Sequence, residues 1–350
     1  MPTSNSTFNA RTTGHEIVAA YPSSAKDKII LITGANPGGI GASSAVSLAA
    51  AHPKLLIIAG RTPAKLAETE KEIKAVNPSV AVKHLQLDLS SQQSCKAAAK
   101  EIMDDASVPQ VDLLINNAGV MDIKERTLSP EGIEMQFATN HIGHFLFTNL
   151  IMPKILAASK TSNPGETRII NLSSRAVLYG PVRFLDWNFT KKESELPASE
   201  HMSQAIRDLW EENEDKPYVP QAGYGQSKTA NVLFSKYLTN KLFAKNGIVS
   251  IAVHPGGIMT NLSRHVDDEK LQRVLEKFKK TADSKFFLKN LDEGCSTTLV
   301  AALDPKMTEG DLFMEDCQVA GWAPDYATSS ELADKLWKLS EEIVGQEFEI

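Results

Sequence analysis

Tyr224 and Lys228, which are four residues apart, are the pair of side chains in this sequence best suited to proton transfer. A spacing of four places both side chains on one face of a helix, where they can share a site. A free phenol has a pKa of about 10, too high for efficient acid–base catalysis near neutral pH. A neighbouring ammonium favours the tyrosinate and lowers that pKa. The pair therefore predicts acid–base chemistry at an oxygen atom of a bound molecule.

The same spacing recurs at Tyr237 and Lys241, further along the same predicted helix, which runs from Tyr224 to about Phe243. Tyr224 would open this helix near the ends of the predicted strands, whereas Tyr237 would lie deep along it. The first pair also leaves room for a full helix and a strand before Pro255. We therefore assign the acid–base role to Tyr224.

A glycine-rich turn predicts a second site. The stretch ITGANPGGIGASSAV places four glycines between a predicted strand and a predicted helix, namely Gly34, Gly38, Gly39 and Gly41. Glycines permit a tight turn and close approach of the backbone to a pyrophosphate, and the helix N-terminus supplies amide donors and a positive dipole. Because this turn follows the first strand of a βαβ unit, it predicts a dinucleotide-binding loop.

The end of the second predicted strand indicates which dinucleotide binds. An acidic residue there would hold the ribose hydroxyls of NAD and repel a 2′-phosphate. This strand ends in Gly60 followed by Arg61, and a guanidinium can pair with the 2′-phosphate through bonds worth roughly 1.5–3 kcal/mol each. The sequence therefore predicts NADP(H) as the cofactor, the alternative for Arg61 being a solvated surface cation.

These residues need a fold that brings them together. Short apolar runs alternate with helical stretches, and we predict strands at 28–33, 54–60, 80–87, 111–116, 167–173 and 248–254. Helices are predicted at 43–51, 63–76 and 92–105, then over Ile133–Leu156 and from Tyr224 to about Phe243. Strands that are apolar on both faces, alternating with helices, imply a parallel sheet that is covered by helices on both sides. We predict an α/β doubly wound Rossmann fold over residues 28–350, with its ligand at the carboxyl ends of the strands and an N-terminal arm over 1–27.

The segment 180–221 interrupts the alternation and is predicted to be an inserted lobe. Met202, Ile206, Leu209 and Trp210 recur in it at helical spacing, which predicts one amphipathic helix. The lobe separates two parts of the proposed site in sequence, so we interpret it as a substrate lid; the alternative is a surface excursion without a role in chemistry.

Composition limits the remaining classes. The chain has 350 residues and a net charge of −6, which argues against broad binding to nucleic acid. Three widely spaced cysteines suit a reducing compartment, and no secretory signal or membrane span is expected, so we predict a cytoplasmic protein. His141 and His144 could share a ligand face, but nothing at a suitable spacing completes a metal site. We expect no metal, and interpret both histidines as packing residues.

The sequence resembles the short-chain dehydrogenase/reductase family, specifically its retinol-dehydrogenase-like and WW-domain-oxidoreductase-like branch. The resemblance runs from about Lys28 to Gly345. Its motifs follow the family's order: TGANPGGIG, LDL (87–89), NNAG (116–119), TNHIGHF (139–145), INLSS (170–174), YGQSK (224–228) and HPGGIMT (254–260).

The resemblance implies a role for each matching residue. The catalytic tetrad would be Asn140, Ser174, Tyr224 and Lys228. The cofactor would contact Gly34, Gly39, Ile40, Gly41, Arg61, Asp88, Leu89, Asn117, Ala118, Gly119, Tyr224, Lys228, Pro255, Gly256 and Thr260. Asp88 and Leu89 would flank the adenine, Thr260 would lie near the nicotinamide carboxamide, and Asn140 would hold a water that connects Lys228 to solvent. Ser173 is the rival of Ser174, and alternation along INLSS together with the family alignment favours Ser174.

Two departures from the family pattern stand out. Four residues, Ala35–Gly38, separate Gly34 from Gly39, where the family has three, so we expect a wider turn. The distance in sequence from Ser174 to Tyr224 is also unusually long because of the lobe.

These features together predict an NADP(H)-dependent oxidoreductase that interconverts a ketone or aldehyde and an alcohol, acting on a fairly large apolar molecule. The alternatives are a catalytically silent dinucleotide-binding interaction protein on the same fold, and an enzyme with different chemistry such as epimerisation. Relatives often dimerise through the helix that carries Tyr224, so a homodimer is expected unless the lobe covers that helix.

Overall fold

A computed structural model describes residues 3–350, apart from residues 213, 261, 263–268, 270–271, 275, 278–286 and 309–312. Its centre is a sheet in the order β3-β2-β1-β4-β5-β6-β7-β8, parallel except for β8. The strands are β1 (Ile29–Thr33), β2 (Leu55–Gly60), β3 (Ala81–Gln86), β4 (Leu113–Asn116), β5 (Arg168–Leu172), β6 (Val249–His254), β7 (Phe313–Glu315) and β8 (Gln318–Val319). The predicted doubly wound sheet is confirmed, with strands β1–β6 within about two residues of their predicted bounds.

Alternate residues of the central strands enter two different cores. Ile29 and Leu31 of β1 pack into one apolar cluster, and Ile30 and Ile32 pack into the other. All four are at most 1% exposed, so β1 is buried on both faces. This explains why the strand is a continuous apolar run rather than an alternating one.

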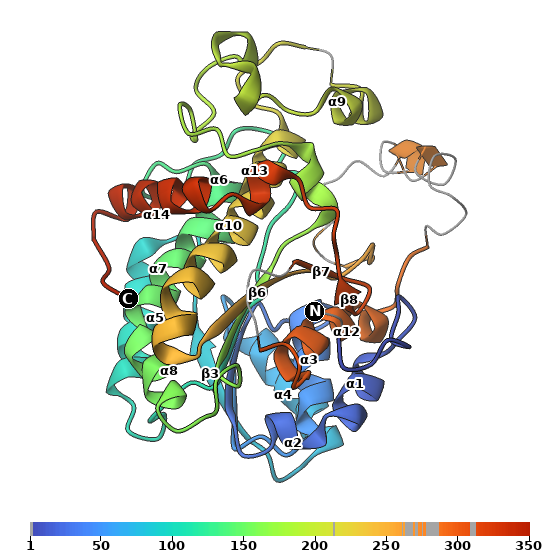
Figure 1. Cartoon of the computed structure of the whole chain (residues 1–350), viewed down its shortest axis with the longest axis vertical. Coiled ribbons are helices and arrows are strands. Elements are labelled where there is room, and N and C mark those ends of the chain that lie inside the picture. Colours follow the sequence, from blue (N-terminus) through green and yellow to red (C-terminus); the bar gives the residue numbers. More distant parts are fainter. Residues whose placement is uncertain are drawn as a thin grey trace.

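Helices cover both faces of the sheet (Figure 1). One face carries α5 (Gln92–Asp104), α7 (Gly143–Leu150), α8 (Met152–Ser159), α10 (Pro220–Asn246) and α14 (Ser330–Val344). The other carries α1 (Gly14–Ala20), α2 (Pro22–Ala25), α3 (Ile40–Ala49), α4 (Pro63–Val76) and α12 (Leu291–Leu303). The short helices α6 (Met135–Phe137) and α13 (Asp325–Thr328) lie near the upper end of α10 in Figure 1.

The prediction of one continuous helix over Ile133–Leu156 is wrong. The helix begins as α6, passes through a π-helical turn, η1 (Ala138–Ile142), continues as α7, and then bends by 60° before α8. Pro153 lies in the first turn of α8, where its missing N–H costs least, and it cannot continue a helix from the preceding residues. The π-turn has a different consequence, because it contains Asn140.

Helix α10 begins before the predicted position. Its first residue is Pro220 rather than Tyr224, so Tyr224 lies in the second turn and does not open the helix. Proline is favoured in the first helical turn because its fixed φ suits a helix and its missing N–H is not needed there. The helix ends at Gly247, whose φ of 66° is in the left-handed region that glycine adopts without strain.

One face of α10 is covered by α14. Trp337 of α14 stacks on Tyr237 of α10, with ring centroids 4.0 Å apart and an interplanar angle of 14°. It also stacks on Phe234, at 6.2 Å. The helix that was expected to meet a second copy therefore packs against the C-terminal helix of its own chain.

The segment before β1 packs closely on the domain. Ile17 and Val18 of α1 are buried, and Gly14 lies so close to α12 that an added Cβ would come within 2.4 Å of the Cys295 sulfur. Within the predicted N-terminal arm, α1 is a regular helix with a capping box between Thr13 and Glu16. Because α1 packs on α12 and α3, it belongs to the domain's second core.

The segment 180–221 projects beyond the sheet, at the top of Figure 1. Its predicted amphipathic helix is α9 (Gln204–Trp210), with Met202 just outside it, and two short 3-10 turns, η3 (Glu193–Glu195) and η4 (Ala198–Glu200), precede it. Asp186 holds the base of this segment, because its carboxylate accepts bonds from Arg183 and from the backbone N–H of Thr190 and Lys191.

Among the described residues, no single helix has the length and apolar composition of a membrane span. The bent pair Met135–Leu150 and Met152–Ser159 passes that test only when its two parts are taken together.

Candidate active site

The glycine turn after β1 forms a cradle of backbone atoms. Gly34 has a φ of 70°, and a Cβ added there would lie 2.7 Å from the Cα of Ala118. A Cβ on Gly41 would lie 2.5 Å from the Asn117 side-chain nitrogen and 2.8 Å from the Gly34 oxygen. Gly39 is the N-cap of α3, so Ile40 and Gly41 are its first residues and their N–H groups face the turn. This cradle fits a pyrophosphate, because its glycines leave the backbone N–H groups at the start of α3 accessible to an anion.

The additional residue in the turn is accommodated by a compact bend. The Gly39 N–H donates to the carbonyl of Asn36 at 3.1 Å, and Gly38 takes a φ of 72°. The Asn36 side chain then lies against Gly60, where an added Cβ would be 3.2 Å from the Asn36 Oδ1 atom. That oxygen is buried without a partner in the described part of the chain. Asn36 thus faces the end of β2, a contact that nothing in the sequence indicates beyond the turn's extra length.

Arg61 follows β2 directly and is exposed. It forms no ion pair with a carboxylate among the residues that the structure describes. Arg61 directly follows Gly60, which lies against the Asn36 side chain of the glycine turn. This is the position that a phosphate on the adenine-side ribose would reach.

Asp88 and Leu89 lie after β3, at the same edge of the sheet. One carboxylate oxygen of Asp88 accepts from the Ser90 N–H at 3.0 Å and the Ser90 hydroxyl at 2.7 Å. Leu89 is 5% exposed, and its carbonyl packs against Gly143 of α7. The second carboxylate oxygen of Asp88 is the one suited to accept from an adenine amine.

The turn after β4 is tied to the end of β1. The Asn117 side-chain amide donates to the Thr33 carbonyl at 2.8 Å, and the backbone N–H groups of Asn117 and Ala118 donate to the Thr33 hydroxyl at 3.0 and 3.1 Å. Gly119 follows, and a Cβ there would lie 3.2 Å from the Asn140 Oδ1 atom and 3.6 Å from the Lys228 ammonium. The cofactor turn therefore borders two residues of the predicted tetrad directly.

The four predicted catalytic residues come from three segments that meet at the carboxyl ends of β4 and β5. Asn140 lies in the π-turn, Ser174 follows β5, and Tyr224 and Lys228 lie on α10. Ser174 is near enough to Tyr224 to lower the pKa of its phenol, and the Ser174 hydroxyl itself accepts from the Ala176 N–H at 3.1 Å. Lys228 donates to the carbonyl of Leu172 at 3.0 Å, and its Nζ atom lies 5.6 Å from the centroid of the Tyr224 ring. The structure thus brings all four together despite the 180–221 insertion.

Asn140 is completely buried and its side chain is fully engaged. Its Oδ1 atom accepts from the Val120 N–H at 2.8 Å, and its Nδ2 atom donates to the Val120 carbonyl and to the Ser227 hydroxyl, each at 2.9 Å. A π-turn is a local widening of a helix that is frequent at functional sites. Here it places Asn140 against Val120, the residue after Gly119.

The rival residues lie elsewhere. The Ser173 hydroxyl donates to the Lys228 carbonyl at 2.7 Å and is buried, so it braces α10 against β5. Tyr237 stacks on Trp337, and Lys241 lies 3.8 Å from Asp334 of α14. Both members of the second Tyr–Lys pair therefore face α14 and not the cofactor turn.

The protein's own groups shift the two key pKa values. Burial raises the pKa of Tyr224 above its ordinary value, and the Ser174 side chain lowers it only in part. Burial lowers the pKa of Lys228 to about 8. Removal from water disfavours the charged forms of both groups, so in the chain without a cofactor burial dominates both pKa values.

The nicotinamide end of the predicted site lies after β6. Pro255 follows that strand, and Gly256 has a φ of 103°, with the Lys289 side chain packed 2.7 Å from where a Cβ would be. Thr260 is half-buried, and its hydroxyl accepts from the Leu262 N–H at 3.2 Å. The Nδ1 atom of His254 accepts from the N–H of Arg175 at 3.2 Å. Because Arg175 follows Ser174, this bond helps to fix the backbone at Ser174.

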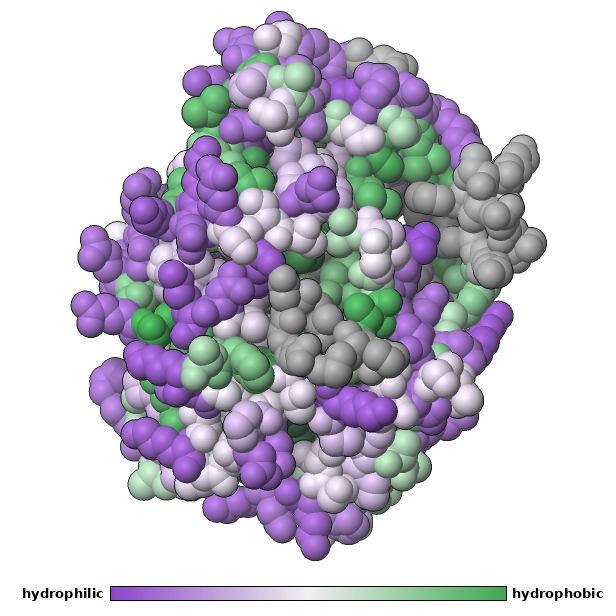
Figure 2. All heavy atoms as spheres, in the orientation of Figure 1, coloured by the Kyte–Doolittle hydropathy of each residue, from purple (hydrophilic) through white to green (hydrophobic). Residues whose placement is uncertain are grey.

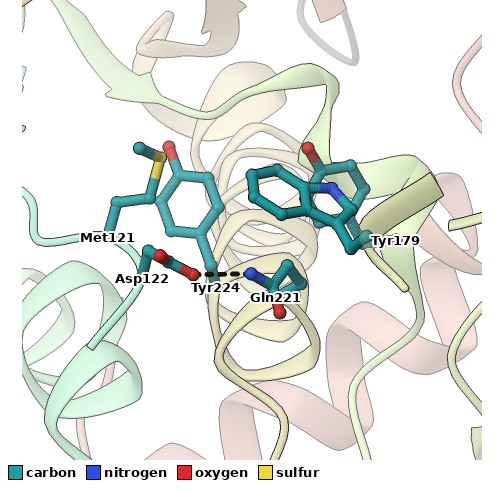
Figure 3. A pocket seen from close by; sticks show the side chains of 6 residues that line it. Met121, Asp122, Tyr179, Gln221 and Tyr224 are labelled. Carbon is teal, nitrogen blue, oxygen red and sulfur yellow. Dashed lines mark hydrogen bonds between the residues drawn. The ribbon is translucent and has the colours of Figure 1, made fainter. Parts of the chain in front are cut away.

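A small pocket opens beside Tyr224. It is lined by Met121, Asp122, Tyr179, Trp210, Gln221 and Tyr224 (Figure 3). Figure 3 shows Met121 next to the Tyr224 ring and Tyr179 on the opposite side, with a hydrogen bond of 2.6 Å from Gln221 to Asp122 below them. Trp210 comes from α9, so the 180–221 segment contributes a wall of the pocket.

An apolar cluster extends from that wall. Trp210 packs with Val274, and the partly buried Ile206 and Leu209 of α9 pack against both. An ion pair also fixes the 180–221 segment, since the Lys277 ammonium donates to the Glu211 carboxylate at 2.9 Å. Figure 2 shows apolar side chains gathered below this part of the molecule, which is at the top of that view. No group of three or more potential metal ligands occurs among the residues that the structure describes.

Comparisons with known proteins show the family of the chain. The family model for short chain dehydrogenases matches residues 28–191. Oxidoreductase fscI of Fusarium equiseti is 37% identical over 253 residues, covering 71% of this chain and 95% of that protein. Retinol dehydrogenase 14 of Mus musculus is 32% identical over 332 residues, covering 91% of this chain and 86% of that protein. A crystal structure of an uncharacterized Mycobacterium paratuberculosis protein matches with a TM-score of 0.66 at 27% identity, covering 95% of this chain and 98% of that one.

The chain belongs to the short-chain dehydrogenase/reductase family and, within it, to the retinol-dehydrogenase-like branch. It is therefore an oxidoreductase of the class that acts on CH–OH groups, with a fold that binds nicotinamide dinucleotides and a small-molecule substrate.

Proposed function

We propose that this protein is an NADP(H)-dependent oxidoreductase that interconverts a ketone or aldehyde and an alcohol through Asn140, Ser174, Tyr224 and Lys228. The observation that carries the proposal is that Lys228 lies over the Tyr224 ring at the end of β5, just before Ser174, beside a pocket whose walls are largely apolar. The hydroxyls of Ser174 and Tyr224 can hold one oxygen atom of a substrate between two donors.

The residues act on the proton and on the oxygen of the substrate. The nicotinamide, when bound, supplies or accepts the hydride. Ser174 orients the substrate oxygen, and Tyr224 gives it a proton in reduction or takes one in oxidation. Lys228 and Ser174 stabilise the tyrosinate that reduction leaves behind, and the buried site strengthens both interactions because water is excluded. Asn140 keeps the turn beside Gly119 in place.

The preference for NADP(H) rests on Arg61 and on the absence of an acidic residue at the end of β2. Arg61 is exposed and directly follows Gly60, which lies against Asn36, and charge-assisted bonds to a 2′-phosphate can form there. An acidic side chain there would repel that phosphate.

We propose a substrate lid formed by the 180–221 segment and a fairly large apolar substrate. Trp210 and Tyr179 stand with ring centroids 6.4 Å apart and cover one side of the pocket. Aromatic walls of this kind favour apolar surface on the ligand. A cytoplasmic location also remains a proposal, supported by three free cysteines, which are all buried. The question of a homodimer depends on α14, which covers one face of α10.

The deciding experiment is a panel of ketones, aldehydes and alcohols incubated with the full chain and NADPH, NADH or their oxidised forms. Absorbance of the reduced nicotinamide gives the rate. We expect turnover of large apolar carbonyl compounds with NADPH in preference to NADH. If the chain binds NADPH but turns over no compound, the alternative of a silent cofactor-binding interaction protein is supported instead.

A further inference from the structure

The imidazole of His144 connects parts of the site that are distant in sequence. It is 1% exposed and both of its nitrogen atoms are engaged. Its Nδ1 atom lies 3.0 Å from the carbonyl oxygen of Asn140, and its Nε2 atom lies 2.8 Å from the hydroxyl of Thr33. The sequence had suggested only a packing residue.

The hydrogen-bond pattern defines the protonation of this imidazole. The Thr33 hydroxyl already accepts from the N–H groups of Asn117 and Ala118, at 3.0 and 3.1 Å. Its single proton is therefore free to donate to the Nε2 atom of His144. The Nδ1 atom then carries the hydrogen and donates to Asn140. Burial lowers the pKa of His144 to about 4, which agrees with a neutral ring near pH 7.

The three partners belong to different elements of the cofactor and catalytic site. Thr33 ends β1, immediately before the glycine cradle, and Asn117 and Ala118 form the turn after β4. Asn140 lies in the π-turn, and its side chain holds Val120 on the other end of that same turn. One neutral ring thus closes a continuous hydrogen-bonded path from the cofactor cradle to the tetrad.

We propose that His144 is a positioning residue that fixes the π-turn of Asn140 relative to the cofactor turn at Thr33, Asn117 and Ala118. This inference rests on the proposed function. The residue contacts neither substrate nor cofactor, and it acts through the backbone that both would meet. Loss of the ring removes a donor and an acceptor from a buried network, so the two turns lose their fixed relative position.

The chain supplies a matched control three residues earlier. His141 is fully buried on the same helical segment, and its Nε2 atom lies 2.8 Å from the hydroxyl of Ser340 on α14. Its ring packs among Phe137, Phe145 and Phe234. It therefore shares the burial of His144 but binds α14 and not the cofactor turn.

The experiment compares His144→Leu with His141→Leu, and adds His144→Gln, Thr33→Val and the double variant Thr33→Val/His144→Leu. Three quantities are measured in the full chain: the Kd for NADPH by nicotinamide fluorescence, kcat and KM for the best carbonyl substrate, and the midpoint of chemical unfolding. We expect His144→Leu to raise the Kd and lower kcat by about tenfold each, since both turns shift. His141→Leu should lower the unfolding midpoint and leave the Kd within about twofold.

Two further comparisons separate positioning from simple destabilisation. His144→Gln keeps a donor and an acceptor and should recover part of the NADPH affinity. Thr33→Val and His144→Leu should be non-additive, because they break the same path. Equal losses of NADPH affinity in the two histidine variants, or full additivity with Thr33→Val, would overturn the inference. If His144→Leu does not fold, the His144→Gln and Thr33→Val results decide it. A wild-type chain that fails to bind NADPH and NADH would instead overturn the proposed function.

Discussion

The ammonium of Lys228 donates to the carbonyl oxygen of Leu172 at 3.0 Å, while its Nζ atom lies 5.6 Å from the centroid of the Tyr224 ring. Leu172 is the last residue of β5, two residues before Ser174. The lysine is therefore anchored to the strand that leads to the serine, and the serine in turn lies near the tyrosine. This arrangement makes the strand end, and not the helix alone, responsible for the geometry of the acid–base pair.

Replacing Tyr224 by phenylalanine tests the acid–base assignment. The ring is kept and only the hydroxyl is lost, so we expect kcat to fall by a factor of about 10² to 10⁴. The Kd for NADPH, measured by fluorescence, should stay within about threefold. Tyr237→Phe is the matched control, because it removes a hydroxyl from the same helix while leaving the stack on Trp337. A Tyr224→Phe variant that turns over like the Tyr237→Phe control would remove Tyr224 from the mechanism.

The low pKa of Lys228 predicts a dependence of stability on pH. Its pKa is about 8 in the folded chain and 10.5 ordinarily, so between these values the unfolded chain binds more protons than the folded one. Stability contributed through this group therefore rises with pH from about 8 to about 10.5 and is constant below about 8. The measurement is the free energy of unfolding of wild type minus that of Lys228→Met at pH 7, 8.5 and 10. If the unfolding free energy of wild type minus that of Lys228→Met is constant or falls between pH 8.5 and 10, the prediction is contradicted.

Arg61→Asp should weaken NADPH binding more than NADH binding. The change removes a cation that can pair with the 2′-phosphate and adds a charge that repels it, so the ratio of the two Kd values should change by about 10- to 100-fold. Lys71→Asp, on an exposed part of α4, makes the same change in net charge away from the site and serves as the control. Equal losses for both dinucleotides would show that Arg61 does not contact the phosphate.

Trp210→Ala tests the lid. The indole covers one side of the pocket, so its removal should raise KM for large apolar carbonyl compounds by about tenfold and have little effect on small ones. NADPH affinity should not change. Leu185→Ala in the same segment is the control, because Leu185 is 60% exposed. If deletion of the tip around 195–215 and Trp210→Ala both leave the kinetics unaltered, the segment is a surface excursion, as the alternative interpretation states.

The limits of sequence-based prediction are visible in particular elements. Strands β7 and β8 were not predicted, because runs of three and two residues carry no periodic signal. The helix over Ile133–Leu156 was predicted as continuous because its apolar pattern continues through the π-turn and through Pro153. The start of α10 was placed too late, since its first turn begins with a proline, Pro220, and contains a glycine, Gly223.

The sequence by itself determined the doubly wound sheet, the family, and the residue types that the site needs, because these are written in local periodicity and in motifs of fixed spacing. Only the tertiary structure decided how those residues are arranged and charged. It showed that burial raises the pKa of Tyr224, that α14 covers α10, and that Trp210 reaches the pocket from a remote segment. It also showed that His144 joins Thr33 to Asn140, while His141 does not. Those properties depend on which atoms from distant segments come within a few ångströms and how much water they exclude, and no local pattern encodes either.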